Sequence, residues 1–359
     1  MVGVNAFWHS LGCCLFIHAV FSTPIPLRTG RSTQWPSSYA SLGDSYAAGA
    51  GAGSPVVFSC GRFSGAYPVK VAGGKQLNIS HENVRYLACG GSNGQSVLFH
   101  QVPFIGNSDV VTITAGGNEI HFFNVLNACV YHWLPFADCE KEIGEARAMV
   151  QSRNLINQID TVIARSAKCM HPDALLLVTG YARFFNERTD LCDHVTFSRT
   201  RPLDYLTKEK RRALNQLVSM LNDVIRASAE LHGVEYIDID PVFEGHRFCE
   251  DGVREPDIGR EATWFFNLPA AKFQGEEQQD ELRSASIIAP KVNNLQHLVK
   301  FGQLQWAISD GEDTESRHTL SFPDLETVRT FHPTEIGHQA IADVIVKAIL
   351  KSKLVLPSD

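Results

Sequence analysis

The chain has 359 residues, of which 44% are hydrophobic and 20% are charged, and it carries a net charge of −7 at neutral pH. This length and composition favour one large domain with a full hydrophobic core over two small domains. An acidic chain without a basic or basic–aromatic run argues against nucleic acid as a partner, and an acidic surface is unfavourable for anionic membranes.

The first 22 residues have the pattern of a secretory signal peptide. Residues 11–21 form an apolar core of suitable length that is too short to span a bilayer. No Lys or Arg precedes this core, so a buried N-terminal helix is the alternative. Residues 23–37 are rich in Pro, Ser and Thr, which predicts a flexible leader, and residues 38–355 are expected to form the folded domain. We therefore expect a secreted, extracellular protein without stable membrane insertion.

Five short apolar runs predict β-strands that are covered on both faces, because they are nearly continuous in Val, Ile and Leu. They are Tyr39–Leu42, Val84–Cys89, Asp109–Thr114, Ala174–Thr179 and Val234–Ile239. Apolar residues at helical spacing predict one long helix over Ile143–Ile163, a second over Leu214–Ile225 that Gly233 ends, and a last one over Ile336–Ile349. This alternation predicts a parallel, doubly wound sheet, whose ligand crevice lies beyond the carboxyl ends of the strands.

Residues 266–322 interrupt this alternation. The segment is polar, with an acidic run over 276–281 followed by a loosely amphipathic run over 285–301. We interpret it as an insertion before the last helix that forms a solvent-exposed helix. A cover over the crevice is the alternative.

Three of the predicted strands lead into residues that suit attack on an ester carbonyl. Gly43-Asp44-Ser45 follows the first strand and precedes small residues, so the Ser45 hydroxyl is placed beside a helix N-terminus. Gly90-Gly91 follows the second strand, and Gly116-Gly117-Asn118 follows the third. Because the carboxyl ends of parallel strands meet at one edge of a sheet, these groups are predicted to lie together. Taken alone, each segment also fits an ordinary turn.

Together with Phe331-His332-Pro333-Thr334, and in this order, these segments resemble the SGNH hydrolases, also called the GDSL esterase/lipase family. That family is named for a Ser, a Gly, an Asn and a His in four separate blocks, which here match Ser45, Gly91, Asn118 and His332. Residues 43–53 are similar to secreted microbial members, and residues 179–186 to fungal ones. The resemblance spans residues 38–350. It implies a flavodoxin-like three-layer α/β/α sandwich with a parallel five-stranded sheet and no metal or organic cofactor.

The resemblance also implies a role for each matching residue. Ser45 would attack the ester carbonyl, and His332 would accept its proton. The negatively charged oxygen that forms would be held by three donors: the Ser45 backbone N–H, the Gly91 backbone N–H and the Asn118 side-chain amide. Two positions depart from the family, since Glu119 stands where Asp is usual and Gly90 where Ser is common, and neither removes a catalytic group. His338 is expected to pack behind the site.

The third member of a catalytic triad is missing from its usual position. In the family an Asp usually lies three residues before the histidine, where this chain has Arg329. An Arg cannot accept the Nδ1–H bond that orients the ring, whereas a backbone carbonyl can accept it whatever the residue type. We therefore expect the Arg329 carbonyl, or one beside it, to accept from His332 Nδ1 and to make a Ser–His dyad. A carboxylate from Asp324 or Glu326 is one alternative, and an inactive arrangement is another.

We predict a monomeric secreted serine esterase that acts on lipid acyl esters, short-chain esters or acylated polysaccharides. Two other functions stay open. The segment Gly90-Gly91-Ser92-Asn93-Gly94 matches the G-x-S-x-G turn of α/β-hydrolases, with Ser92 as nucleophile, although only one strand precedes it in the mature chain and no HGGG-type motif lies upstream. Because the catalytic acid is missing from its usual position, a catalytically weak secreted binding protein on the same fold is the second alternative.

The expected secretion determines how the cysteines are interpreted. Two of the nine fall in the signal segment, and the other seven suggest three disulfides and one free thiol. The sequence alone leaves the pairing open, while family resemblance and proximity suggest the pairs Cys60–Cys89, Cys129–Cys139 and Cys192–Cys249. Cys169 is then unpaired. No CxxC or HExxH pattern is present, so no metal site is expected. Asn78-Ile79-Ser80 is the one glycosylation sequon.

Overall fold

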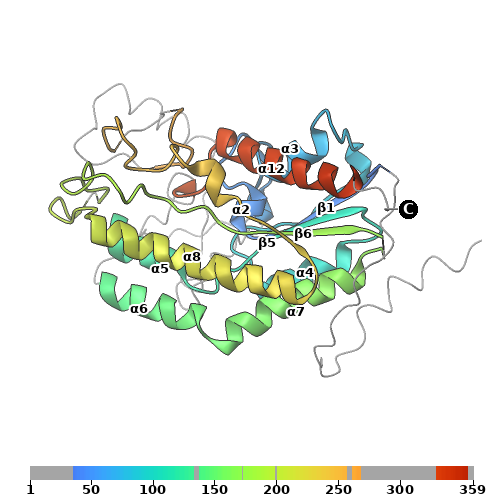
Figure 1. Cartoon of the computed structure of the whole chain (residues 1–359), viewed down its shortest axis with the longest axis horizontal. Helices are drawn as coiled ribbons and strands as arrows, with labels where there is room; N and C mark the ends of the chain where they lie inside the picture. The colour runs from blue at the N-terminus through green and yellow to red at the C-terminus, as the bar shows by residue number, and fades with distance from the viewer. Residues whose placement is uncertain are drawn as a thin grey trace, which may run out of the picture.

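The computed structural model describes residues 35–132, 137–171, 173–198, 200–256, 261–267 and 329–354. Its centre is a five-stranded parallel sheet in the order β4-β1-β5-β6-β7 (Figure 1). The strands are β1 (Tyr39–Gly43), β4 (Val84–Tyr86), β5 (Val110–Thr114), β6 (Leu175–Thr179) and β7 (Glu235–Ile237). Each lies on one of the predicted apolar runs. The strand order is that of the flavodoxin-like doubly wound fold, which confirms the predicted architecture.

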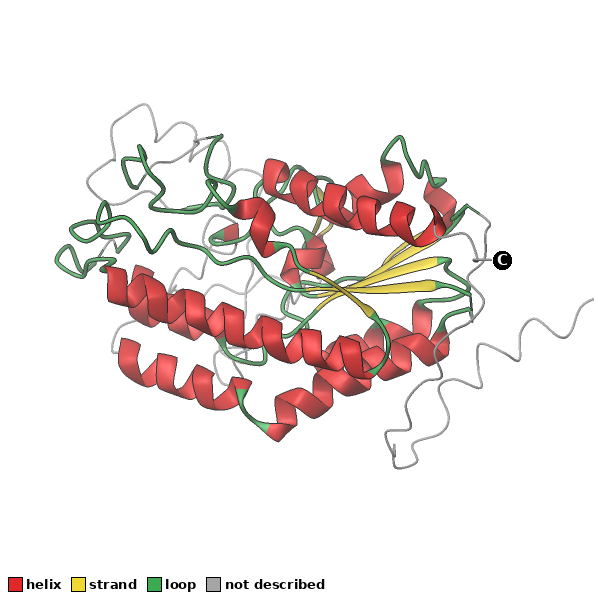
Figure 2. Ribbon diagram, in the orientation of Figure 1, coloured by secondary structure: helices red, strands yellow, loops and turns green. Residues whose placement is uncertain are grey.

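Helices cover both faces of the sheet (Figure 2). One face carries α3 (Tyr67–Gly73) and α12 (Glu335–Leu354), which pack on each other. The other face carries α4 (Gly94–His100), α5 (Phe122–Leu126), α6 (Cys139–Val150), α7 (Arg153–Cys169) and α8 (Lys208–Leu231). Every residue of β1 and β5 is buried between these layers, as their apolar sequences predict.

Shorter elements complete the described fold. The four-residue helix α2 (Ser45–Ala48) follows β1, and a small antiparallel sheet pairs β2 (Pro55–Val57) with β3 (Arg62–Phe63). Single helical turns lie at η1 (Phe58–Cys60), η2 (His81–Asn83), η3 (Val102–Phe104), η4 (Asn127–Tyr131) and η5 (Asp240–Phe243). Among the described residues, no helix is both long enough and apolar enough to cross a bilayer.

The single helix predicted over Ile143–Ile163 is wrong, because the structure divides it into α6 and α7. The Ser152 hydroxyl accepts a hydrogen bond from the Leu155 backbone N–H at 3.2 Å and so begins a new helix. Figure 1 shows that the two helices meet at an angle. Both pack against α8, and the break lets each turn its own apolar face inward.

The cysteines differ from expectation at one position. Disulfides join Cys60 to Cys89, Cys129 to Cys139 and Cys192 to Cys249, which are the pairs that the resemblance suggests. Cys169 is also disulfide-bonded. The expected free thiol is therefore wrong. The sequon residue Asn78 is exposed, and its glycosylation stays a prediction.

Several expected segments lie largely outside the described residues. The signal peptide expected over 1–22 lies wholly outside them. Of the leader expected over 23–37, only residues 35–37 are described, and of the insertion expected over 266–322, only residues 266 and 267 are described. At the end of the expected leader, Ser37 donates to Asp109 Oδ2 from its backbone N–H at 2.8 Å and from its hydroxyl at 2.9 Å. The chain is thus attached to the domain just before β1 begins.

Candidate active site

Ser45 is the first residue of α2 and lies directly beyond the carboxyl end of β1. The turn needs glycine at Gly43, because φ is +137° there and a Cβ would lie 2.0 Å from the Thr114 carbonyl oxygen. Asp44 caps the short helix, since its Oδ1 accepts from the Tyr46 backbone N–H at 2.9 Å. The Asp44 N–H donates to the Thr114 carbonyl at 3.0 Å, which fastens the turn to β5.

His332 reaches Ser45 from the far end of the chain. Its Nε2 lies 2.6 Å from Ser45 Oγ, across a sequence separation of 287 residues. The ring is carried on the loop just before α12, where the Thr334 hydroxyl accepts from the Gly337 N–H at 3.4 Å. This short distance lets Nε2 accept the hydroxyl proton of Ser45.

The other ring nitrogen of His332 faces a backbone carbonyl. Nδ1 lies 3.2 Å from the Thr330 oxygen, the carbonyl beside the one expected from Arg329. The Arg329 oxygen accepts from the His332 backbone N–H at 2.8 Å, and it also favours the charged form of the ring. No carboxylate of the described residues lies within ion-pair distance of the ring, and Asp324 and Glu326 are outside the described ranges.

Burial decides the charge of this histidine. Loss of solvent lowers the pKa of His332 from its ordinary value to about 4, although the carbonyls of Thr330 and Arg329 act in the opposite direction. The imidazole is therefore neutral near pH 7. A neutral ring with one nitrogen on a hydroxyl is suited to take that hydroxyl's proton.

Gly91 and Asn118 lie at the same cavity as Ser45 and His332. Gly91 has φ of +75°, a conformation that glycine adopts without steric cost. Asn118 Nδ2 donates to the Ser92 carbonyl at 2.8 Å, which holds the amide in place. An amide carries two hydrogens, so the second remains for another acceptor. The structure thus brings together all four residues that the sequence singled out.

Tyr181 is a part of the site that the sequence analysis missed. Its hydroxyl is 2.5 Å from Asp44 Oδ2 and accepts from the Gly117 N–H at 3.1 Å, so it joins the serine turn to the loop that carries Asn118. Burial raises the pKa of Asp44 to about 6, while the hydrogen bond from Tyr181 acts to lower it. Tyr181 lies just beyond the carboxyl end of β6, at the sheet edge where the other site residues were expected, and that position was the available signal.

Glu119 also holds the segment that follows Gly91. Its Oε1 accepts from the Gly94 N–H at the start of α4, while its Oε2 is buried without a hydrogen-bond partner in the described part of the chain. Burial raises the pKa of this carboxyl to about 7. Asn118 and Glu119 therefore both bind the segment that follows Gly91, and the longer Glu keeps a polar contact where the family usually has Asp.

The cavity beyond Ser45 is apolar along most of its wall. The space between its walls, the solvent-open mouth included, is about 900 Å³. Its apolar side chains come from the α5 region, from the segment after β6 and from α8: Ile120, Phe122, Phe123, Leu126, Phe184, Val218 and Leu221. Its polar lining includes Ser45, Asn118 and His332.

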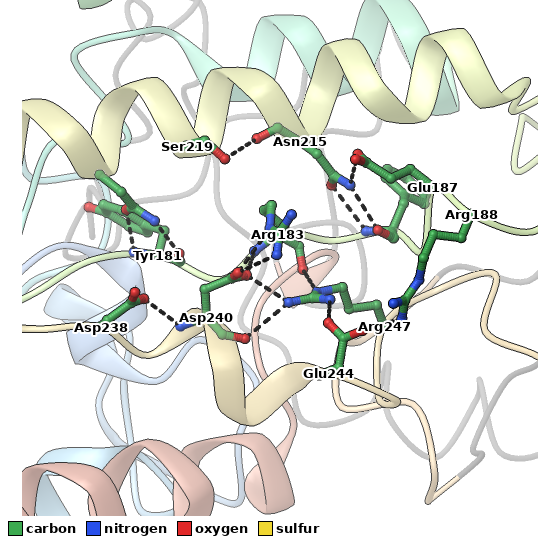
Figure 3. Close-up of polar contacts among 12 residues, drawn as sticks. Tyr181, Arg183, Glu187, Arg188, Asn215, Ser219, Asp238, Asp240, Glu244 and Arg247 are labelled. Atoms are coloured by element: carbon green, nitrogen blue, oxygen red, sulfur yellow. Dashed lines mark hydrogen bonds and ion pairs between the residues drawn. The ribbon is translucent and has the colours of Figure 1, made fainter.

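A polar network holds the segment after β6 in place (Figure 3). Asp240 accepts from Arg183 at 2.8 Å and from Arg247 at 3.0 Å, and Arg247 is almost fully buried. On the other side, Asn215 of α8 donates to the Phe185 carbonyl at 2.8 Å and to Glu187 at 2.9 Å (Figure 3). These contacts keep the wall that carries Tyr181 and Phe184 in place.

Ser92 and His338 make hydrogen bonds that support the fold around the site. The Ser92 hydroxyl accepts from Gln101 Nε2 at 3.0 Å, and the Gln101 amide also binds the backbone N–H and C=O of Gly43. No histidine in the described part of the chain bonds to Ser92. His338 is fully buried behind the site, where its Nδ1 accepts from the Tyr67 N–H at 3.3 Å.

Comparison with known proteins agrees with this geometry. Residues 41–258 match the GDSL-like lipase/acylhydrolase family, and the chain belongs to that family. It is 32% identical over 215 residues to Lipase 1 of Streptomyces coelicolor, covering 59% of this chain and 72% of that protein. It is 31% identical over 216 residues to a lipase of Streptomyces rimosus, covering 59% and 73%. These relatives are bacterial and do not support the fungal resemblance.

Two solved structures share the fold. A phospholipase A1 from Streptomyces albidoflavus superposes with a TM-score of 0.58 at 24% identity, covering 89% of this chain and 99% of that one. An extracellular lipase from Streptomyces rimosus gives a TM-score of 0.58 at 23% identity, covering 87% and 99%. The protein is thus a carboxylic ester hydrolase of the GDSL-like family, and the α/β-hydrolase alternative is wrong.

Proposed function

We propose that this enzyme hydrolyses its ester through an acyl-enzyme on Ser45, with His332 as general base and no carboxylate partner. The observation that carries the proposal is the position of His332, with Nε2 2.6 Å from Ser45 Oγ and Nδ1 on the Thr330 carbonyl. A backbone carbonyl can orient the ring and select the tautomer with a proton on Nδ1. This arrangement argues against a binding protein, because a neutral base already contacts the hydroxyl.

The steps follow from this geometry. As Ser45 Oγ bonds to the ester carbon, its proton passes to His332 Nε2 and the carbonyl oxygen becomes negative. The Ser45 and Gly91 N–H groups and the Asn118 amide are the proposed donors to that oxygen. The C–O bond to the alcohol then breaks, and His332 protonates the leaving oxygen. Water attacks the acyl-enzyme by the same route and releases the acid.

We further propose that the substrate is an ester with an apolar acyl chain. The wall formed by α5 and α8 offers hydrophobic side chains and few polar groups, which favours a lipid acyl group over an acetyl group on a sugar. The relatives named as lipases point the same way. The three described disulfides and the apolar segment over 11–21 support an extracellular location.

Filling the cavity should shorten the preferred acyl chain. Val218 lies on α8, is buried and lines the cavity, so Val218→Phe places a ring where the chain would lie. We expect kcat/KM on p-nitrophenyl palmitate to fall by about 10-fold or more relative to the acetate ester. The measurement is a panel of p-nitrophenyl esters from acetate to palmitate.

The control for that panel is Gln216→Phe, which adds the same ring to the exposed side of the same helix. It should leave the chain-length preference unchanged. If Val218→Phe lowers the rates on all esters equally, the acyl chain does not lie against α8. If the wild-type protein hydrolyses the acetate ester and not the palmitate ester, the proposed apolar acyl chain is wrong.

The pH profile tests whether His332 works without a carboxylate. Because burial lowers the pKa of His332 to about 4 and only the neutral ring accepts a proton, kcat/KM should rise through about pH 4 and level off above it. A carboxylate on Nδ1 would favour the charged ring and raise this pKa. Asp324→Asn and Glu326→Gln should therefore leave the acid limb in place, without the ~10⁴-fold loss that follows removal of a triad acid.

Returning each sample to neutral pH before a second assay separates titration from acid unfolding. The dyad would be contradicted if the acid limb of the pH profile moves in either variant, or if either variant loses activity by about 10⁴-fold. The residue replaced in that variant would then be the missing carboxylate.

A further inference from the structure

The residue after Ser45 connects the two turns that form the proposed dyad. The Tyr46 hydroxyl donates to the Phe331 carbonyl oxygen at 2.9 Å, across a sequence separation of 285 residues. Tyr46 is 7% exposed and Phe331 is 2% exposed, so this hydrogen bond is shielded from water. One end of the contact is thus adjacent to the serine and the other is adjacent to the histidine.

This hydrogen bond completes the restraint of the peptide group that leads into His332. The peptide between Phe331 and His332 has its oxygen on Tyr46, and its N–H donates to the Arg329 carbonyl at 2.8 Å. In the preceding peptide, the Thr330 oxygen faces His332 Nδ1, and the Phe331 N–H donates to the Phe266 carbonyl at 2.9 Å. Both peptide groups are therefore held at their oxygen and at their N–H. The peptide between Thr330 and Phe331 supplies the acceptor for the ring.

The backbone at Phe331 needs such restraint. Its φ is +64°, a left-handed conformation that is strained for a bulky residue. The Phe331 ring is packed among other aromatic rings at centroid distances of 4.8 to 5.5 Å: Tyr131, Phe184, Phe185 and Phe248. Packing fixes the ring, while the Tyr46 hydroxyl is the group that fixes the carbonyl.

Tyr46 itself is held firmly. Its backbone N–H donates to Asp44, its ring meets the Tyr181 ring edge-on at 5.1 Å, and its centroid lies 5.3 Å from that of His332. Burial and the charge of Asp44 raise the pKa of the Tyr46 hydroxyl well above its ordinary value. The hydroxyl thus remains protonated and remains a donor.

We infer that Tyr46 is a positioning residue for His332: its hydroxyl holds the turn at Phe331 so that the Thr330 carbonyl can orient the ring in place of a carboxylate. The inference rests on the proposed function, in which His332 is the base. Tyr46 thus contributes to orienting the histidine, a task that the acid of a catalytic triad performs in other enzymes.

Tyr46→Phe tests the inference because it removes only the hydroxyl. We expect kcat to fall by about 10- to 100-fold with KM within about twofold, since a displaced base slows proton transfer without changing the acyl cavity. The rate at which diethyl p-nitrophenyl phosphate labels Ser45 should fall in parallel. Expressing rates per labelled site corrects for any unfolded protein.

The matched control is Tyr39→Phe. The Tyr39 hydroxyl is also buried and bonds to Thr112 Oγ1 at 2.6 Å, but it lies at the other end of β1. Both variants should lose stability in a thermal melt, while only Tyr46→Phe should lose kcat. A change confined to KM, or a loss of kcat no larger than that of Tyr39→Phe, would overturn the positioning role.

Failure of this inference can be told apart from failure of the proposed function. If Ser45→Ala and His332→Ala are inactive while Tyr46→Phe is fully active, the dyad stands and the positioning role falls. If His332→Ala keeps its activity, the proposed function itself is wrong, and the inference falls with it.

Discussion

Replacing Ser45 by alanine should lower kcat by roughly 10³-fold or more while the protein stays folded. In the part of the chain that the structure describes, the Ser45 hydroxyl is the nucleophile that contacts His332 Nε2, and its loss removes the bond-forming atom. The Ser45 side chain is not part of the core cluster, so the thermal midpoint should change little. The measurement is kcat on a p-nitrophenyl ester together with a thermal melt of the same sample.

Ser92→Ala is the control for this prediction. It removes a hydroxyl from the neighbouring loop, where Gln101 and not a histidine is the partner, and it should keep most of the activity. If Ser92→Ala is inactive and Ser45→Ala retains near-normal activity, the nucleophile is wrongly assigned.

Asn118→Ala should lower kcat by about 10²- to 10³-fold with KM little changed. The reason is that an oxyanion donor acts mainly on the charge that develops in the transition state, and less on the bound ester. Separate determination of kcat and KM on one ester checks this. A change that appears only in KM would mean that Asn118 binds substrate and does not stabilise the transition state.

Asn118 also donates to the Ser92 carbonyl, so its removal loosens the loop before α4. Asn93→Ala controls for that effect, because Asn93 caps the same helix by accepting from the Ser96 N–H at 2.9 Å. This variant disturbs the loop without removing the proposed donor. Equal losses of kcat in the two variants would refute the assignment of Asn118.

The central sheet could be predicted because burial on both faces leaves a simple pattern in the sequence. β1 and β5 are buried throughout, and their nearly continuous apolar runs have no other stable place in a soluble domain. The flanking helices are less well determined. A helical repeat does not show where one helix ends and the next begins when Ser152 can cap a new helix without breaking the apolar spacing.

By itself, the sequence also determined most of the candidate site. In a parallel sheet, any group directly after a strand lies at the carboxyl edge, so Ser45, Gly91 and Asn118 could be placed together without knowledge of their contacts. His332 could be added only through its resemblance to a family block, since no local pattern brings a residue across 287 positions.

Only the tertiary structure decided how the histidine is oriented. A backbone carbonyl is an acceptor in every residue, so the sequence cannot show whether Arg329 or Thr330 faces Nδ1. That choice depends on the left-handed turn at Phe331, which a bulky residue adopts only when distant contacts hold it. Those contacts come from Tyr46 and from rings on other elements, and hydrogen bonds between residues 285 positions apart form only when the whole domain has folded.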